Sequence, residues 1–193
     1  MTTLPSNPII TLHNSKHDAR FGATRTTQSL SGWSQELGVV VSRSAVRGFS
    51  AARLRRYRQA RKASIEDLAD AAGVSPQAIS AWENGRAAPT PELLARVASK
   101  LRITVADIVP IPDDELSLSD RRAHAGLTQS RAAESLGISA TLLGRIEKGK
   151  KEYDLSRAQQ LADLYGVDVD MIESSWQRDR ERRKAIATRF EDS

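Results

Sequence analysis

Two short segments of the chain hold side chains whose chemistry suits contacts with nucleic acid. Residues 75–86 include Gln77 and Arg86. In residues 139–151 an arginine, Arg145, precedes three lysines: Lys148, Lys150 and Lys151. A glutamine amide can form two hydrogen bonds with adenine, and an arginine can bind O6 and N7 of guanine in the same way. Lysines neutralise backbone phosphates. What these side chains can do depends on the elements that position them.

Both segments lie at the same place in an internal repeat. Residues 54–108 recur at 118–172 without a gap, so that each residue matches the one 64 positions later. Ten of the matched pairs are identical: Leu54/Leu118, Arg58/Arg122, Ala69/Ala133, Gly73/Gly137, Ser75/Ser139, Glu83/Glu147, Gly85/Gly149, Ala98/Ala162, Val105/Val169 and Ile108/Ile172. An ungapped repeat of this length indicates two copies of one structural unit. The function of that unit is the best guide to the function of the protein.

Composition excludes several classes of protein. The 193 residues include no cysteine, which rules out a disulfide framework and a thiolate metal site and suits the cytoplasm. We expect no cofactor, no metal, no membrane span and no signal peptide. The net charge of +5 and pI near 9.8 are compatible with a polyanionic partner. However, residues 111–175 hold 8 basic and 12 acidic side chains, so bulk charge does not predict that the second copy binds DNA.

Capping and turn residues predict five helices in each copy. In the first copy the expected helices are 50–62, 64–72, 75–83, 91–101 and a short one near 105–108, with Ser64 and Ser75 as N-caps and Gly73 and Asn84-Gly85 as stops. The second copy follows the same plan, with Thr128 and Ser139 as caps and a fourth helix from about 155 to 165. The predicted fold is therefore all-α, with two tandem five-helix bundles.

The strings GVSPQAISAWENG (73–85) and GISATLLGRIEKG (137–149) resemble the helix-turn-helix of the lambda-repressor and Cro class, also called the XRE family. In such a motif the third helix enters the major groove and presents its N-terminal residues to the bases. The resemblance covers both repeats but neither end of the chain. It implies that each repeat is a DNA-binding domain.

The resemblance also implies which residues contact DNA. In the first repeat Pro76, Gln77 and Ala81 match base-contacting positions, Ser80 shares their face, and Asn84 and Arg86 match positions that contact phosphate. In the second repeat the base-facing matches are Ala140, Thr141 and Arg145, followed by Lys148, Lys150 and Lys151 at the end of the helix. A solvated helix face that alternates charges for solubility is the alternative explanation of Lys150 and Lys151.

The two repeats differ at one position that the family uses to support the recognition helix. A glutamine just after the cap of helix two commonly binds a phosphate there, and Gln129 occupies that position in the second repeat. The first repeat has Ile65 instead, so we expect the support to be missing. Because every base-facing position also differs, we expect the two repeats to recognise different sequences.

The segments outside the repeats are less informative. We expect residues 1–47 to form a disordered basic arm, with Arg20, Arg25, Arg43 and Arg47 able to reach DNA, although a plain flexible leader fits equally well. Leu37 to Val41 could make a short strand, and the spacing of His13 and His17 is interpreted as fortuitous. A two-proline linker follows Ile108. Predicted domains are thus 1–47, 48–110, 111–175 and a charged C-terminal helix, 176–193.

These patterns predict a sequence-specific regulator of transcription, a repressor of phage or mobile-element type, that binds an asymmetric double-stranded DNA site and associates with the nucleoid. One alternative is a single DNA-binding domain joined to a second domain that dimerises or holds a partner such as a toxin, and a homodimer is compatible with either. An enzyme acting on DNA is the third hypothesis. It is disfavoured because no clustered carboxylates with a metal-binding pattern stand outside the bundles.

Overall fold

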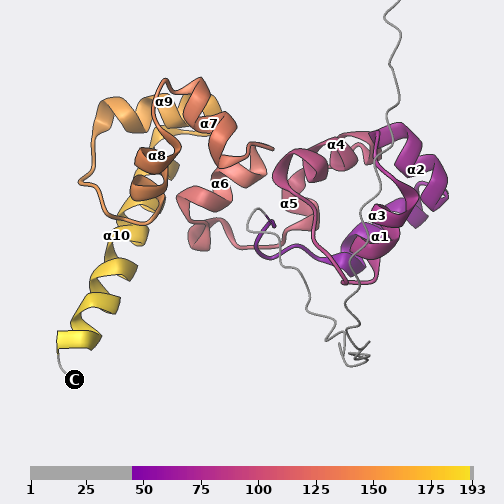
Figure 1. Ribbon diagram of the computed structural model, residues 1–193, viewed down its shortest axis with the longest axis horizontal. Helices are drawn as coiled ribbons and strands as arrows, with labels where there is room; N and C mark the ends of the chain where they lie inside the picture. Colours follow the sequence, from indigo (N-terminus) through magenta and orange to yellow (C-terminus); the bar gives the residue numbers. More distant parts are fainter. Residues whose placement is uncertain (1–44, 192–193) are drawn as a thin grey trace, which may run out of the picture. The chain divides into compact units, whose positions relative to one another are not determined.

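The computed structural model describes residues 45–191, and the regular elements of this range are all helices, without a strand. The first repeat forms α1 (Ala51–Ala60), α2 (Ile65–Ala72), α3 (Pro76–Glu83), α4 (Pro91–Leu101) and α5 (Val105–Ile108). The second forms α6 (Leu118–His124), α7 (Gln129–Ser135), α8 (Ala140–Glu147), α9 (Leu155–Tyr165) and α10 (Val169–Glu191). A single 3-10 turn, η1 (Asp113–Glu115), lies between them (Figure 1). The predicted all-α fold is confirmed.

Local chemistry sets the helix ends as predicted. Ser64 caps α2 in a reciprocal arrangement with Asp67, which accepts from the Ser64 backbone while the Ser64 hydroxyl accepts from the Asp67 backbone. Gly73 ends α2 at φ +63°, a left-handed conformation that a side chain disfavours. Ser75 caps α3, and Pro76 stands in its first turn, where a missing N–H costs nothing. These caps determine where the recognition helix begins.

Each repeat encloses its own apolar cluster. Leu54, Ile79, Leu94 and Ile108 are completely buried in the first cluster, beside the small side chain of Ala69, which allows close helix packing. In the second cluster the equivalents of all five are likewise buried: Leu118, Leu143, Ala158, Ile172 and Ala133. The matching pattern of burial shows why the repeat preserves these apolar positions.

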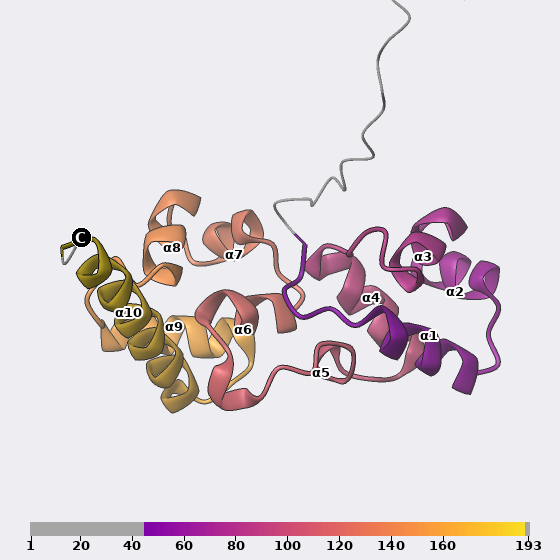
Figure 2. The same cartoon turned by 90° about the horizontal axis from the view of Figure 1, so that it is seen from below.

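Helix α10 extends the second bundle beyond the repeat. It continues without interruption from Val169 to Glu191, through the point where a separate C-terminal helix is expected to begin at residue 176. Trp176 is 1% exposed and packs edge-on against Tyr153, with ring centroids 5.5 Å apart. In Figure 2 α10 runs alongside α9, with α8 beside it. The first half of α10 is thus part of the second core, whereas the side chains of residues 181–189 are exposed.

The N-terminus of α6 is stabilised by contacts from both directions along the chain. The buried Asp120 accepts hydrogen bonds from Arg47, at 3.0 Å from its Nε, and from Ser117. Burial alone would raise the pKa of Asp120, but these hydrogen bonds outweigh it and lower the pKa below its usual value. The carboxylate of Asp179 accepts from the backbone N–H of Leu118 at 2.9 Å, and burial raises the pKa of Asp179. Arg47, one of the four arginines expected to be able to reach DNA, is therefore paired with Asp120 in the structure.

Several expectations fall outside the described residues: the arm 1–44 with its arginines Arg20, Arg25 and Arg43, the short strand at 37–41, and the pair His13 and His17. Within residues 45–191, no helix combines the length and the apolar character needed to cross a bilayer.

Candidate nucleic-acid interface

Helix α3 divides its residues between the core and solvent as predicted. Ile79 and Trp82 are buried, whereas Gln77 is exposed on the other side. A shallow concavity of about 570 Å³ collects the outward side chains of the first repeat: Ile65, Glu66, Pro76, Gln77, Ser80, Ala81 and Arg86. Four of these seven, namely Pro76, Gln77, Ala81 and Arg86, match positions that contact DNA in the family, and Ser80 shares their face. The structure therefore brings these five predicted contact residues of the first domain into one surface, whereas the sixth, Asn84, does not line the concavity.

The end of α3 involves a residue that the sequence did not single out. Arg55, on α1, donates from one terminal nitrogen to the carbonyl of Glu83 and to Oδ1 of Asn84, both at 2.8 Å. The amide nitrogen of Asn84 donates in turn to the carbonyl of Ser80 at 2.8 Å. Asn84 thus holds the end of the helix together, and exposed Arg55 adds a cation beside it. No local pattern could indicate this, because Arg55 and Asn84 lie 29 residues apart.

Helix α8 shows the same division of faces with different outward side chains. Leu143 and Ile146 are buried in the second core. Ala140, Thr141 and Arg145 are exposed, so the three predicted base-facing residues share the solvent side of the helix. The exposed face of α3 therefore holds the amide of Gln77, whereas that of α8 holds the guanidinium of Arg145.

Three lysines follow α8, and the structure separates their roles. Lys148 and Lys150 are exposed, and no ion pair joins either of them to a described side chain. Lys151 is half-buried, and its backbone carbonyl accepts a hydrogen bond from Nε1 of Trp176 at 3.1 Å. The loop between α8 and α9 is therefore anchored on α10 at Lys151, while the two other cations extend into solvent.

A buried ion pair lies beneath each recognition helix. Nε of Arg58 donates to Glu83 at 2.6 Å, and Nε of Arg122 donates to Glu147 at the same distance. The arginine side chains are 12% exposed and the glutamates 3% and 5%. The hydrogen bonds that Arg58 donates to the Glu83 carboxylate raise the pKa of Arg58. Each arginine also donates to a backbone carbonyl just before helix two of its domain. The pair thus links the first helix, the turn and the last residue of the recognition helix.

Gln129 supports α8 through this ion pair. Its amide nitrogen donates to Oε2 of Glu147 at 2.8 Å, and a Cβ at Gly144 on α8 would lie 3.2 Å from that nitrogen. The expected support of the recognition helix is therefore present in the second repeat, whereas a phosphate contact by Gln129 stays a prediction. In the first repeat, Ile65 has no such donor. In the first repeat it is Arg55, on α1, whose Nε approaches the Glu83 carboxylate, at 3.8 Å.

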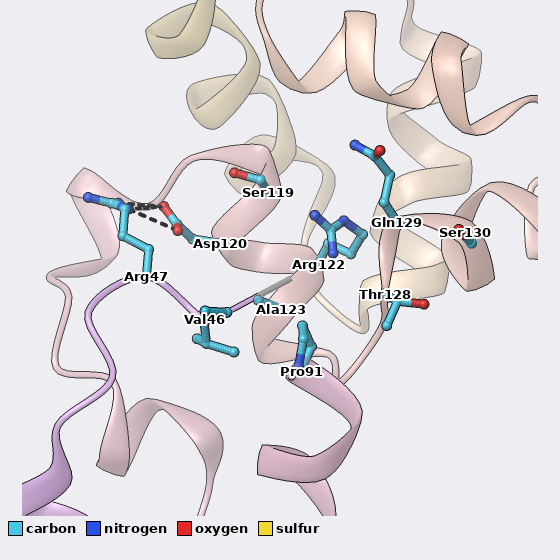
Figure 3. A pocket seen from close by; sticks show the side chains of 11 residues that line it. Val46, Arg47, Pro91, Ser119, Asp120, Arg122, Ala123, Thr128, Gln129 and Ser130 are labelled. Atoms are coloured by element: carbon cyan, nitrogen blue, oxygen red, sulfur yellow. Dashed lines mark hydrogen bonds and ion pairs between the residues drawn. The ribbon is translucent and has the colours of Figure 1, made fainter. Parts of the chain in front are cut away.

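A cavity of about 410 Å³ lies beside Gln129 and the α6 N-terminus, but its charges are already paired. Figure 3 shows Arg47 directed onto Asp120, with Arg122 and Gln129 on the opposite wall. Arg122 is engaged by Glu147. Within residues 45–191, no group of three or more metal-ligating side chains comes together. The exposed cations and amides of the candidate interface lie instead on α3, on α8 and in the loops that follow them.

Comparison with protein families agrees with the geometry. A family described as "Helix-turn-helix" matches residues 54–108, and a second, described as "Helix-turn-helix domain", matches residues 117–174. Comparison with curated proteins and with solved structures returns no match. The two matched ranges coincide with the two repeats, and each contains one recognition helix with its buried ion pair. The chain therefore contains two tandem helix-turn-helix domains, which support a DNA-binding regulator of transcription.

Proposed function

We propose that the protein is a sequence-specific regulator that binds one asymmetric double-stranded DNA site through both domains, taken as 48–110 and 111–175. The observation that supports this most is the difference between α3 and α8. The two helices share a scaffold, a capping serine and a buried ion pair, yet they expose Gln77 in one case and Arg145 in the other. An amide favours adenine and a guanidinium favours guanine. Two such helices suit two different half-sites.

Each domain contributes base contacts and phosphate contacts in this proposal. Gln77, Ala81, Thr141 and Arg145 face base edges, together with Pro76, Ser80 and Ala140. Arg86, Lys148 and Lys150 bind phosphates, and Asn84, Gln129 and Lys151 position the ends of the recognition helices. Phosphate contacts set orientation and base contacts set specificity. Because one chain holds both domains, the second binds at an effective concentration near millimolar, as expected for a short linker.

We propose repression as the outcome of binding, in the cytoplasm on the nucleoid. A protein that occupies a promoter can exclude polymerase by volume alone, whereas activation requires a further contact surface. No cofactor enters this function.

Replacing Gln77 or Arg145 by alanine should each cost about 1–3 kcal/mol on the preferred site and relax the preference at different base pairs. Lys150→Ala is the matched control, because a lost phosphate contact should weaken all sequences alike. Binding of each variant to a library of single-base substitutions of the site measures both effects. If the two substitutions relaxed the same base pair, two separate recognition helices would be excluded. If Arg145→Ala changed no preference, the second domain would be the dimerising or partner-binding one.

A further inference from the structure

A cationic cleft lies where the end of α8 meets α10. It has a volume of about 490 Å³, and two lysines, Lys148 and Lys150, line it together with Arg182 and Arg183 of α10. Lys150 and Arg183 also line a smaller cleft of about 260 Å³ that contains Lys184. The exposed half of α10 is thus a second row of cations beside the loop that follows the recognition helix, and Figure 1 shows it continuing past α8.

The positive charge of this cleft is largely uncompensated. Two carboxylates line it, but Glu147 is buried and bound by Arg122, and Asp179 is buried and accepts from the backbone of Leu118. Arg182 approaches Asp179 only at 3.8 Å. Among the side chains that the structure describes, no ion pair engages Lys148, Lys150 or Arg183. A surface of this kind attracts a polyanion.

Close packing fixes the lysine loop against α10. Gly149 lies directly on the helix backbone, since a Cβ there would come within 2.4 Å of the carbonyl oxygen of Asp179. Its φ of +63° further requires glycine. The hydrogen bond from Trp176 to Lys151 and the ion pair of Arg180 with Glu152 hold the loop on both sides of this contact. The backbone that carries the four cations of the cleft is therefore held in place relative to α8.

We infer that the C-terminal half of α10 binds the DNA backbone, with phosphates held between Lys148 and Lys150 on one side and Arg182 and Arg183 on the other. Lys148 lies three residues after Arg145, so the two occupy neighbouring positions on the same side of α8. A DNA strand that Arg145 contacts would therefore pass beside the cleft. Ile186 and Ala187 complete the lining with apolar surface, which suits the sugars between phosphates. This inference rests on the proposed DNA binding by the second domain.

The double variant Arg182→Ala/Arg183→Ala of the full chain tests the inference. If both arginines bind phosphates, the slope of log K against log salt should become less steep by about 2. The loss of affinity between about 50 and 200 mM salt should then shrink roughly 10-fold. The base preference should not change. The control is Lys100→Ala/Arg102→Gly, which removes two exposed cations from the end of α4 and should leave the slope as it is.

The outcomes are distinguishable. A slope equal to that of the wild type overturns the inference while leaving the proposed function intact, and a changed base preference overturns it too, because α10 would then act through α8. If the double variant changed only the mass of the DNA-free protein in solution, this face would join copies of the protein, and the inference would be overturned. If the wild-type chain binds no DNA, the proposed function itself fails. Because Arg183 is exposed and has no described partner, the single variant Arg183→Ala repeats the test without disturbing Asp179.

Discussion

Replacing Glu147 by alanine should lower the free energy of unfolding by about 3–5 kcal/mol. The substitution leaves Arg122 almost buried, at 12% exposure, without a carboxylate, and it also removes the acceptor of the Gln129 amide. An unpaired buried charge is costly because the interior solvates it poorly. Glu83→Ala should act in the same way in the first domain. Urea denaturation followed by circular dichroism measures the change.

Two controls separate the buried pair from ion pairs in general. Arg131 and Glu134 form an exposed pair on α7, so Glu134→Ala should cost no more than about 0.5 kcal/mol. Replacing both buried partners, as in Arg122→Met/Glu147→Leu, should restore much of the stability because no lone charge remains. A loss below about 1 kcal/mol for Glu147→Ala would show that water or a neighbour compensates Arg122, contrary to the contacts described above.

Raising the salt concentration from about 50 to about 200 mM should weaken DNA binding by roughly 10²- to 10⁵-fold. Each phosphate neutralised by a lysine or arginine releases condensed counterions, and the exposed cations Arg86, Lys148 and Lys150, with a few neighbours, predict a slope of roughly −4 to −8. Fluorescence anisotropy with a labelled duplex, repeated over a salt series, gives the slope. Lys150→Ala should make it less steep by about 1. A flat response would contradict the electrostatic surface proposed for both domains.

The sequence predicts most of the fold because its helix ends depend on neighbours in the chain. Ser64 and Asp67, or Ser75 and Pro76, act within one helical turn. Gly73 ends α2 because glycine readily adopts the left-handed conformation, at φ +63°, that this helix end requires. The apolar periodicity of α3 likewise identifies Ile79 and Trp82 as core residues, and the opposite face follows from them. Local chemistry and periodicity therefore locate the candidate interface.

Contacts between distant residues could not be predicted in this way. Arg47 binds Asp120 across 73 residues, and Asp179 caps α6 across 61. The identity of Arg58 with Arg122 and of Glu83 with Glu147 was visible in the repeat, but their pairing depends on how the first and third helices cross. The cleft between the α8 loop and α10 arises similarly, since only the fold brings Gly149 onto the backbone of Asp179.

Selection of bound fragments from a random DNA pool, with measurement of the mass of the complex on the selected site, tests the tandem arrangement most directly. We predict one chain on an asymmetric site, with two unlike segments separated by about one helical turn, ~10 bp, because unlike recognition helices in one chain need no palindrome. Gln77→Ala should relax one segment and Arg145→Ala the other. A perfect palindrome bound by two chains, with preference unaffected by Arg145→Ala, would contradict the account and assign the second domain to dimerisation.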